Sequence, residues 1–282
     1  ALAITKSMAV HAVEAKYRGD FVRDVLFARA GPVEQVVGHF TELGWDVTRP
    51  MVVLMASLDL HSEPGDRTPA EVRTAQDRFA NAWVTVVGRY DKTAPVVAFA
   101  REVVALVPAP DGEAPRDVVA GLVRLVSGDG GGGRNSFATG VSRLLDNPAA
   151  IPAAYEQARR SIQVGRQMQG DSALAHFDDL GAFRLLSLIE DPAELHNFAK
   201  EVLGAIATEG DPEAADMRAT LRVLLDTNFN VAETSRRLHF HYNTLRYRIT
   251  KLERIVGRFT EDPELQLDLS LALRVMQMRG NN

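Results

Sequence analysis

Residues 230–257 contain two short amphipathic helical patterns separated by three residues, and this spacing constrains the fold more than any other feature of the sequence. Asn230 can accept a hydrogen bond from the first turn of the first helix, and Glu233, three residues later, predicts a capping box. The first pattern ends near His239, and the second ends at Gly257, a residue typical of helix C-termini. Two short helices joined by so short a turn predict a helix-turn-helix.

The second helix of this motif has one apolar stripe and one polar, basic face. The apolar stripe recurs at steps of four, three and four residues and comprises Leu245, Ile249, Leu252 and Val256. At about 100° per residue, the opposite face carries Asn243, Arg246, Tyr247, Thr250 and Arg254, with Thr244 and Lys251 beside it. Arginine can donate two hydrogen bonds to guanine and asparagine can pair with adenine, so this face suits the major groove of DNA.

These residues divide into two expected groups. We expect base contacts from Asn243, Thr244, Arg246 and Tyr247, and phosphate contacts from Arg248, Lys251 and Arg254. The backbone N–H groups of the first turn also favour a phosphate. The full expected DNA-binding set is His241, Tyr242, Asn243, Thr244, Arg246, Tyr247, Arg248, Thr250, Lys251 and Arg254.

The charge distribution supports this interpretation over that of an ordinary solvated helix face. Residues 216–258 contain nine Lys or Arg and four Asp or Glu, a formal charge of +5, whereas the whole chain carries −5. A basic segment in an otherwise acidic protein is typical of a surface that binds a polyanion such as DNA.

The run from Glu233 to Ile249 closely resembles the C-terminal helix-turn-helix of the PucR/CdaR family of bacterial transcription regulators. The family pattern is approximately E-T-A, then Leu, then H-x-N-T-L-x-Y-R-[IL]. The matching residues here are Glu233, Thr234, Leu238, His241, Asn243, Thr244, Leu245, Tyr247, Arg248 and Ile249. The chain departs from the pattern at Ser235, where alanine is usual, and at Tyr242, where a basic residue is common.

The resemblance implies a cytoplasmic regulator that binds specific double-stranded DNA and responds to a small-molecule effector of unknown identity. A homodimer is also expected, because one recognition helix contacts only a few base pairs and paired half-sites are usual.

The segment before this motif has a different period, with strand-length apolar runs between helical patterns. Strands are predicted at 51–60, 96–99, 103–107, 135–141 and 173–177, and helices at 70–88, 117–126 and 151–167. The order β-α-β-β-α-β with additions is ferredoxin-like. It is also the order of GGDEF domains, and PucR/CdaR regulators commonly carry a degenerate GGDEF-like domain before the DNA-binding part.

The residues expected to carry GGDEF chemistry are mostly missing. In active diguanylate cyclases the turn between the second and third strands has the sequence G-G-[DE]-E-F, whereas here it is A-F-A-R-E, and only Glu102 is acidic. Asp59 is a candidate remnant metal ligand, but one carboxylate cannot hold a two-metal phosphoryl-transfer site. The glycine-rich run 128–134 lacks the G-K-[ST] ending of a phosphate loop and predicts a flexible connection. We therefore predict no catalytic residues, no metal site and no cofactor.

The predicted fold class is α+β, with N-terminal helices, a ferredoxin-like sandwich and an all-α helix-turn-helix domain. The predicted domains are 1–44, 45–181 and 182–282, with the motif at 230–257. The first segment holds helices at Ser7–Arg29 and from Pro32, whose apolar faces pack either on the next domain or on a second copy of the chain. The leucines of the last helix, which starts at Pro263, cover more than one face and predict burial on two sides. One side is expected against the DNA-binding domain itself, and the other against a neighbouring domain or a second subunit.

Other features exclude several classes of protein. The chain has no cysteine, which excludes disulfides, zinc fingers and thiol nucleophiles. No apolar run approaches the roughly 20 residues of a membrane span, and nothing resembles a signal peptide. The first residue is Ala1 and not Met, which suggests a processed or truncated chain.

Two alternative functions stay open at this stage. A nucleotide-binding or cyclase enzyme predicts bound GTP with a divalent metal. A protein-interaction module predicts partner binding through the last helix and no salt-dependent DNA binding.

Overall fold

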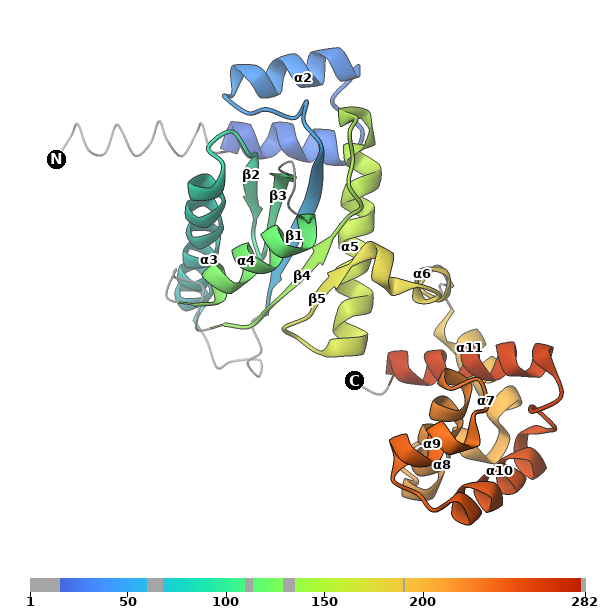
Figure 1. Ribbon diagram of the computed structural model, residues 1–282. Helices are drawn as coiled ribbons and strands as arrows, with labels where there is room; N and C mark the ends of the chain where they lie inside the picture. Colours follow the sequence, from blue (N-terminus) through green and yellow to red (C-terminus); the bar gives the residue numbers. More distant parts are fainter. Residues whose placement is uncertain (1–15, 60–67, 110–113, 129–134, 190, 280–282) are drawn as a thin grey trace. The chain divides into compact units, whose positions relative to one another are not determined.

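The computed structural model describes residues 16–59, 68–109, 114–128, 135–189 and 191–279. Its contacts divide the chain between Gly181 and Ala182 into two compact units, a sheet unit and a helical unit (Figure 1). Of the run 128–134, predicted to be a flexible connection, residues 129–134 lie outside the described residues. Among the helices of the described segments, none combines the length and the apolar composition of a membrane span.

The sheet unit is built on five strands in the order β2-β3-β1-β4-β5. Their bounds are β1 Met51–Leu58, β2 Val96–Phe99, β3 Glu102–Pro108, β4 Phe137–Val141 and β5 Leu174–His176. The central strand β1 is antiparallel to both β3 and β4, and β5 is added parallel to β4. Every residue of β1 is buried, which explains its nearly continuous apolar sequence. The ferredoxin-like order of the first four strands is as predicted.

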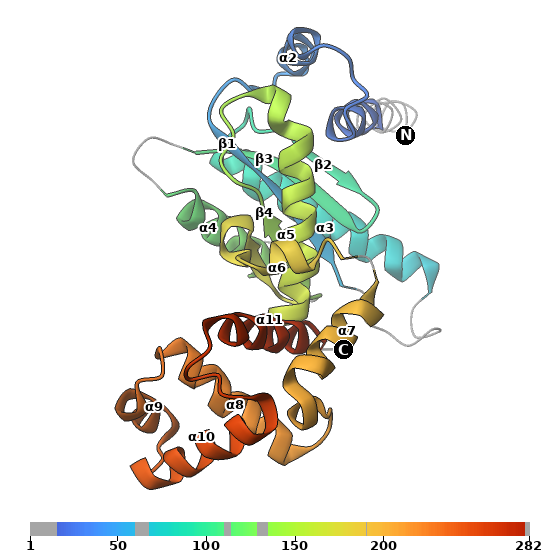
Figure 2. The same cartoon turned by 90° about the vertical axis from the view of Figure 1, so that its right-hand side faces the viewer.

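Helices cover both faces of this sheet (Figures 1 and 2). One face packs against α3 (Pro69–Tyr90) and α4 (Pro115–Ser127), with Trp83 and Phe79 buried there. The other face packs against α5 (Ile151–Gln169). Alternate residues of β1 point to opposite faces of the sheet. The core on the α3 side contains Val52, Leu54 and Ala56, and the core on the α5 side contains Met51, Val53 and Met55. Two short 3-10 helices, η1 (Pro148–Ala150) and η2 (Phe177–Leu180), flank α5 and β5.

The N-terminal helices pack on the sheet, the first of the two partners that the sequence allowed. Residues 16–26 are helical, and Val22 joins the core on the α5 side together with Phe40 of α2 (Val33–Glu42). The predicted helix 7–29 was too long at its end, and residues 7–15 lie outside the described chain. The sequence had predicted that α2 starts at Pro32. Pro32 is instead the N-cap, the residue before the first turn.

The helical unit contains six α-helices and one 3-10 helix within its described residues. They are α6 Phe183–Leu186, α7 Pro192–Leu203, η3 Gly204–Ala207, α8 Pro212–Asp226, α9 Val231–Leu238, α10 Tyr242–Val256 and α11 Pro263–Arg279. Asp191, Asp211 and Asp262 each precede a proline and accept a hydrogen bond from the first turn of α7, α8 and α11. Leu221, Leu224, Leu245, Leu252 and Leu269 form a fully buried set.

The last helix is buried on one of the two sides that the sequence predicted. Leu269 and Leu273 of α11 are buried, whereas the side chain of Leu267 is 60% exposed. Leu267 lies about 160° around the helix from Leu269, whereas Leu273 lies close to Leu269 on the packed side. Burial of the Leu267 side against a neighbouring domain or a second subunit stays a prediction.

Candidate nucleic-acid interface

The two helices of the predicted motif have the bounds that the sequence indicated. Asn230 caps α9, its Oδ1 accepting the Glu233 N–H at 3.0 Å. The capping box is only half formed, because the Glu233 carboxylate instead pairs with Arg236 at 2.7 Å and with Arg237 at 3.0 Å. The pKa of Glu233 is lowered by the hydrogen bond from Arg237 and by the charge of Arg236. The Glu233 carboxylate at the start of α9 is therefore paired with two arginines of the same helix.

The turns on either side of α9 use residues with left-handed backbone. His239, with φ 55°, ends α9, and the Phe240 N–H donates to the Ser235 carbonyl at 3.0 Å. Before α9, the buried hydroxyl oxygens of Thr227 and Thr234 lie 2.6 Å apart. This hydrogen bond joins the end of α8 to α9. These contacts hold α9 against the end of α8 and close the turn that leads into α10.

The inner face of α10 is the predicted apolar stripe. Leu245 and Leu252 are fully buried, Val256 is nearly so, and Ile249 is partly buried. Because these residues pack α10 on the unit, the opposite face must be turned to solvent.

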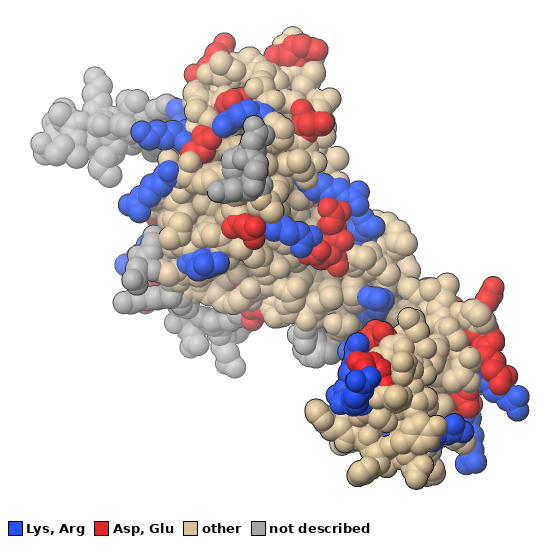
Figure 3. Space-filling view, viewed as in Figure 1, with Lys and Arg blue, Asp and Glu red and all other residues tan. Residues whose placement is uncertain are grey.

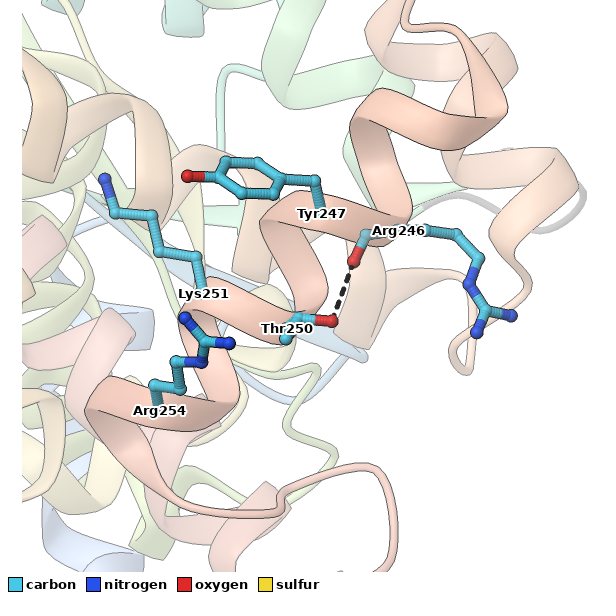
Figure 4. A pocket seen from close by; sticks show the side chains of 5 residues that line it. All are labelled: Arg246, Tyr247, Thr250, Lys251 and Arg254. Carbon is cyan, nitrogen blue, oxygen red and sulfur yellow. Dashed lines mark hydrogen bonds between the residues drawn. The ribbon is translucent and has the colours of Figure 1, made fainter.

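The outer face of α10 brings most of the predicted DNA-binding residues together. The exposed members are His241, Tyr242, Asn243, Thr244, Arg246, Tyr247, Thr250 and Arg254. Tyr247 is 70% exposed, unusual for an aromatic side chain without a partner. Arg246, Tyr247, Thr250, Lys251 and Arg254 line a surface hollow of about 350 Å³ (Figure 4).

Within this hollow the side chains extend in different directions. Figure 4 shows Tyr247 and Lys251 on one side of α10 and Arg246 on the other. The Thr250 hydroxyl donates to the Arg246 carbonyl at 3.2 Å, and Arg246 lies 6.0 Å from the ring centroid of Tyr242. Arg254 makes no hydrogen bond or ion pair with any described residue. Arg246 and Arg254 therefore keep guanidinium N–H groups for another molecule.

Two of the predicted residues are held by α8. The Arg248 guanidinium lies 2.5 Å from Asp216 Oδ2, donates to Thr220 Oγ1 at 3.0 Å and covers the Phe240 ring at 4.3 Å. Lys251 pairs with Glu213, and this contact raises the pKa of the Lys251 ammonium. Figure 3 shows basic and acidic side chains next to one another on the helical unit. The sequence carried no local signal for these pairs.

In the sheet unit, an arginine pairs with Asp59, the candidate remnant metal ligand of a GGDEF site. Asp59, at the end of β1, is buried and pairs with Arg166 of α5, which also donates to the Ser57 carbonyl and hydroxyl oxygens at 3.1 Å each. Glu102 is half-buried, and burial raises the pKa of its carboxyl group. A guanidinium already neutralises the carboxylate that a metal would need, so these residues do not fit the metal–nucleotide site of a diguanylate cyclase. Within the described segments, no three His, Asp or Glu side chains form a metal-binding group.

Comparison with known protein families agrees with both parts of this description. The family model of the PucR C-terminal helix-turn-helix domain matches residues 217–275, which include α9 and α10. The model of the GGDEF-like domain matches residues 29–164, which include α2 and the first four strands. The chain belongs to the PucR/CdaR family. In this PucR/CdaR protein, the resemblance that the motif residues predicted is confirmed.

Three curated relatives are similar to this PucR/CdaR protein. The purine catabolism regulatory protein of Bacillus subtilis is 29% identical over 51% of this chain and 27% of its own length. The carbohydrate diacid regulator of Escherichia coli is 24% identical over 84% of this chain and 60% of its own. Bacillus subtilis YsfB is 29% identical over 44% of this chain and 32% of its own. The chain thus spans less than two thirds of each of these relatives.

Among solved structures, a regulator of polyketide synthase expression from Bifidobacterium adolescentis aligns over 93% of both chains. Its sequence identity is 19% and the TM-score is 0.42.

Proposed function

We propose that this chain is a sequence-specific, DNA-binding transcription regulator and that α10 enters a major groove. One observation carries the proposal. The buried stripe of Leu245 and Leu252 turns a single face of α10 to solvent. That face gathers exposed polar and tyrosine side chains with Arg246, whose guanidinium contacts Tyr242, and Arg254; neither arginine forms an ion pair with a described carboxylate. The relatives named as regulators of purine catabolism and of carbohydrate diacids support the proposal. Bacterial DNA lies in the cytoplasm, so the proposed protein acts there.

The proposed contacts divide along the length of α10. Asn243, Thr244, Arg246 and Tyr247 lie in its first two turns and would face base edges, as the N-terminal part of a recognition helix does. Arg254 lies in the last turn, where a major-groove helix approaches the sugar-phosphate backbone. The free N–H groups of the first turn, near His241 and Tyr242, would bind a phosphate.

Substitution of Arg246 and of Arg254 should separate these two kinds of contact. Arg246→Ala is expected to cost about 1–3 kcal/mol on the preferred DNA and to relax base preference, because a bidentate base contact is lost. Arg254→Ala should weaken preferred and scrambled DNA by similar factors and lower the salt slope by about one, because a phosphate contact is lost. Fluorescence anisotropy on both duplexes measures these quantities.

The matched control is Arg222→Ala. Arg222 is an exposed arginine of α8, on the side away from Asp216 and Thr220, so its removal should leave both affinities nearly unchanged. Equal losses on preferred and scrambled DNA from the Arg246 and Arg254 variants would contradict the assigned division.

The proposed active form is a homodimer. One α10 covers only a few base pairs, and two recognition helices must lie about 34 Å apart to contact successive major grooves. Sedimentation or mass photometry should therefore give a dimer, at least on DNA. A monomer both with and without DNA would contradict this expectation.

We further propose that the sheet unit is a sensor or assembly platform for a small-molecule effector and has no cyclase activity. The support is the Asp59–Arg166 ion pair and the turn 98–102, which lacks both glycines of an active cyclase. Incubation with GTP and Mg²⁺ followed by product analysis tests the second part. Formation of a cyclic dinucleotide would contradict it.

A further inference from the structure

The basic face of α10 is bordered by two carboxylates from α8. Asp216 is bound to Arg248, and Glu213 is bound to Lys251, one turn further along α10. Arg248 is more enclosed than Lys251. Only 22% of the Arg248 side chain is exposed, and it contacts Asp216, Thr220 and Phe240. Arg248 is therefore a positioning residue, which fixes α10 to α8 and to Phe240 in the turn.

The pair of Lys251 and Glu213 has a different character. The Lys251 side chain is 38% exposed and that of Glu213 is 69% exposed, so water and ions reach both groups. Lys251 also lines the hollow on the outer face of α10 with Tyr247 and Arg254. The Glu213 carboxylate consequently lies at the edge of the surface that would face phosphates.

We infer that Glu213 is an intramolecular competitor of DNA, whose carboxylate holds the Lys251 ammonium until a backbone phosphate replaces it. The inference rests on the proposed DNA-binding function of α10. Exposed ion pairs are weak, roughly 0.2–1 kcal/mol, so a phosphate of the highly charged duplex can displace Glu213. The carboxylate then remains near the phosphates and repels them, which lowers the affinity for every sequence.

The competition predicts a signature in the salt dependence. When Lys251 moves from Glu213 to a phosphate, it displaces a counterion from the DNA, but the freed Glu213 carboxylate stays beside the phosphates and favours retention of a cation there. The two effects offset each other, so the Lys251 contact adds little to the salt slope of the wild type. Without the Glu213 charge, the same contact should add about one to the slope.

The test is Glu213→Gln, measured on preferred and scrambled DNA across a salt series. We expect roughly twofold to fivefold tighter binding to both duplexes, the range that an exposed ion pair allows, and a steeper salt slope. Glu264→Gln is the matched control. Glu264 follows Asp262-Pro263 as Glu213 follows Asp211-Pro212, and each glutamate N–H donates to the aspartate at 3.0 Å. The control removes the same charge from the same position in a helix that lies outside the DNA-facing surface.

A double-mutant cycle with Lys251→Ala separates competition from simple repulsion. Competition predicts that Lys251→Ala costs more affinity in the Glu213→Gln background than in the wild type. Equal costs in the two backgrounds would overturn the inference, as would unchanged or weaker binding by Glu213→Gln or an equal gain from Glu264→Gln. If the wild type itself binds no DNA across the series, the proposed function fails, a result distinct from these.

Discussion

Replacing Gly140 with alanine should destabilise the sheet unit by about 3 kcal/mol or more, the upper end of the cost of overpacking. Gly140 lies in β4 directly beneath α5. A Cβ atom at this position would lie 2.0 Å from the Ala158 carbonyl oxygen and 2.8 Å from the Ile162 backbone nitrogen. Both are backbone atoms of α5 and cannot rotate away as the end of a side chain would. The helix must therefore move off the sheet, or the unit must unfold.

Tryptophan fluorescence during urea unfolding measures this effect selectively. The chain has two tryptophans, Trp45 and Trp83, and both are buried in the sheet unit. The control is Gly121→Ala in α4, where an added Cβ meets nothing within 4 Å. That change should be neutral or stabilising by about 0.5–1 kcal/mol, because alanine is favoured over glycine inside a helix. A Gly140→Ala protein as stable as the wild type would show that α5 lies further from β4 than described.

Leu252→Ala should destabilise the helical unit by about 2–5 kcal/mol and abolish DNA binding at ordinary temperatures. Leu252 is fully buried and is part of the stripe that holds α10 on the unit. Its truncation leaves a cavity under the recognition helix, and a typical domain has only about 5–15 kcal/mol to lose. The loss of helical circular dichroism on heating should move to lower temperature.

The matched control for this change is Leu267→Ala in α11, at a leucine that is 60% exposed. A surface substitution of this kind should stay within about 0.5 kcal/mol. Tryptophan fluorescence should report an unchanged sheet unit in both variants, because the helical unit contains no tryptophan. Equal destabilisation by the two leucine substitutions would contradict the described orientation of α10 and α11.

The helix-turn-helix could be predicted closely because its signals are local. Asn230 accepts a hydrogen bond from a residue three positions away, and Gly257, with φ 96°, ends α10 where only glycine is unstrained. The strand order was predictable for a related reason, since β1 is a nearly continuous apolar run and β2 and β3 are adjacent in sequence. Periodicity also identified the face of α10 that is turned to solvent.

Contacts between distant segments could not be predicted in the same way. Lys251 and Glu213 are 38 residues apart, and Arg166 and Asp59 are 107 residues apart. Each pair depends on how one helix is rotated against another element, which no local pattern specifies. The packing of Val22 and Phe40 on the sheet was likewise open, because an apolar helix face does not identify its partner.

The most direct test of the central claim is a binding titration of the wild-type chain against DNA flanking its own gene. A scrambled duplex of equal length and composition serves as the control, and the salt concentration runs from roughly 50 to 200 mM. Affinity for both duplexes should fall steeply with salt, and the flanking DNA should be preferred throughout. Equal affinity for the two duplexes, or no binding to either at the lowest salt, would contradict the assignment of α10 as a sequence-specific recognition helix.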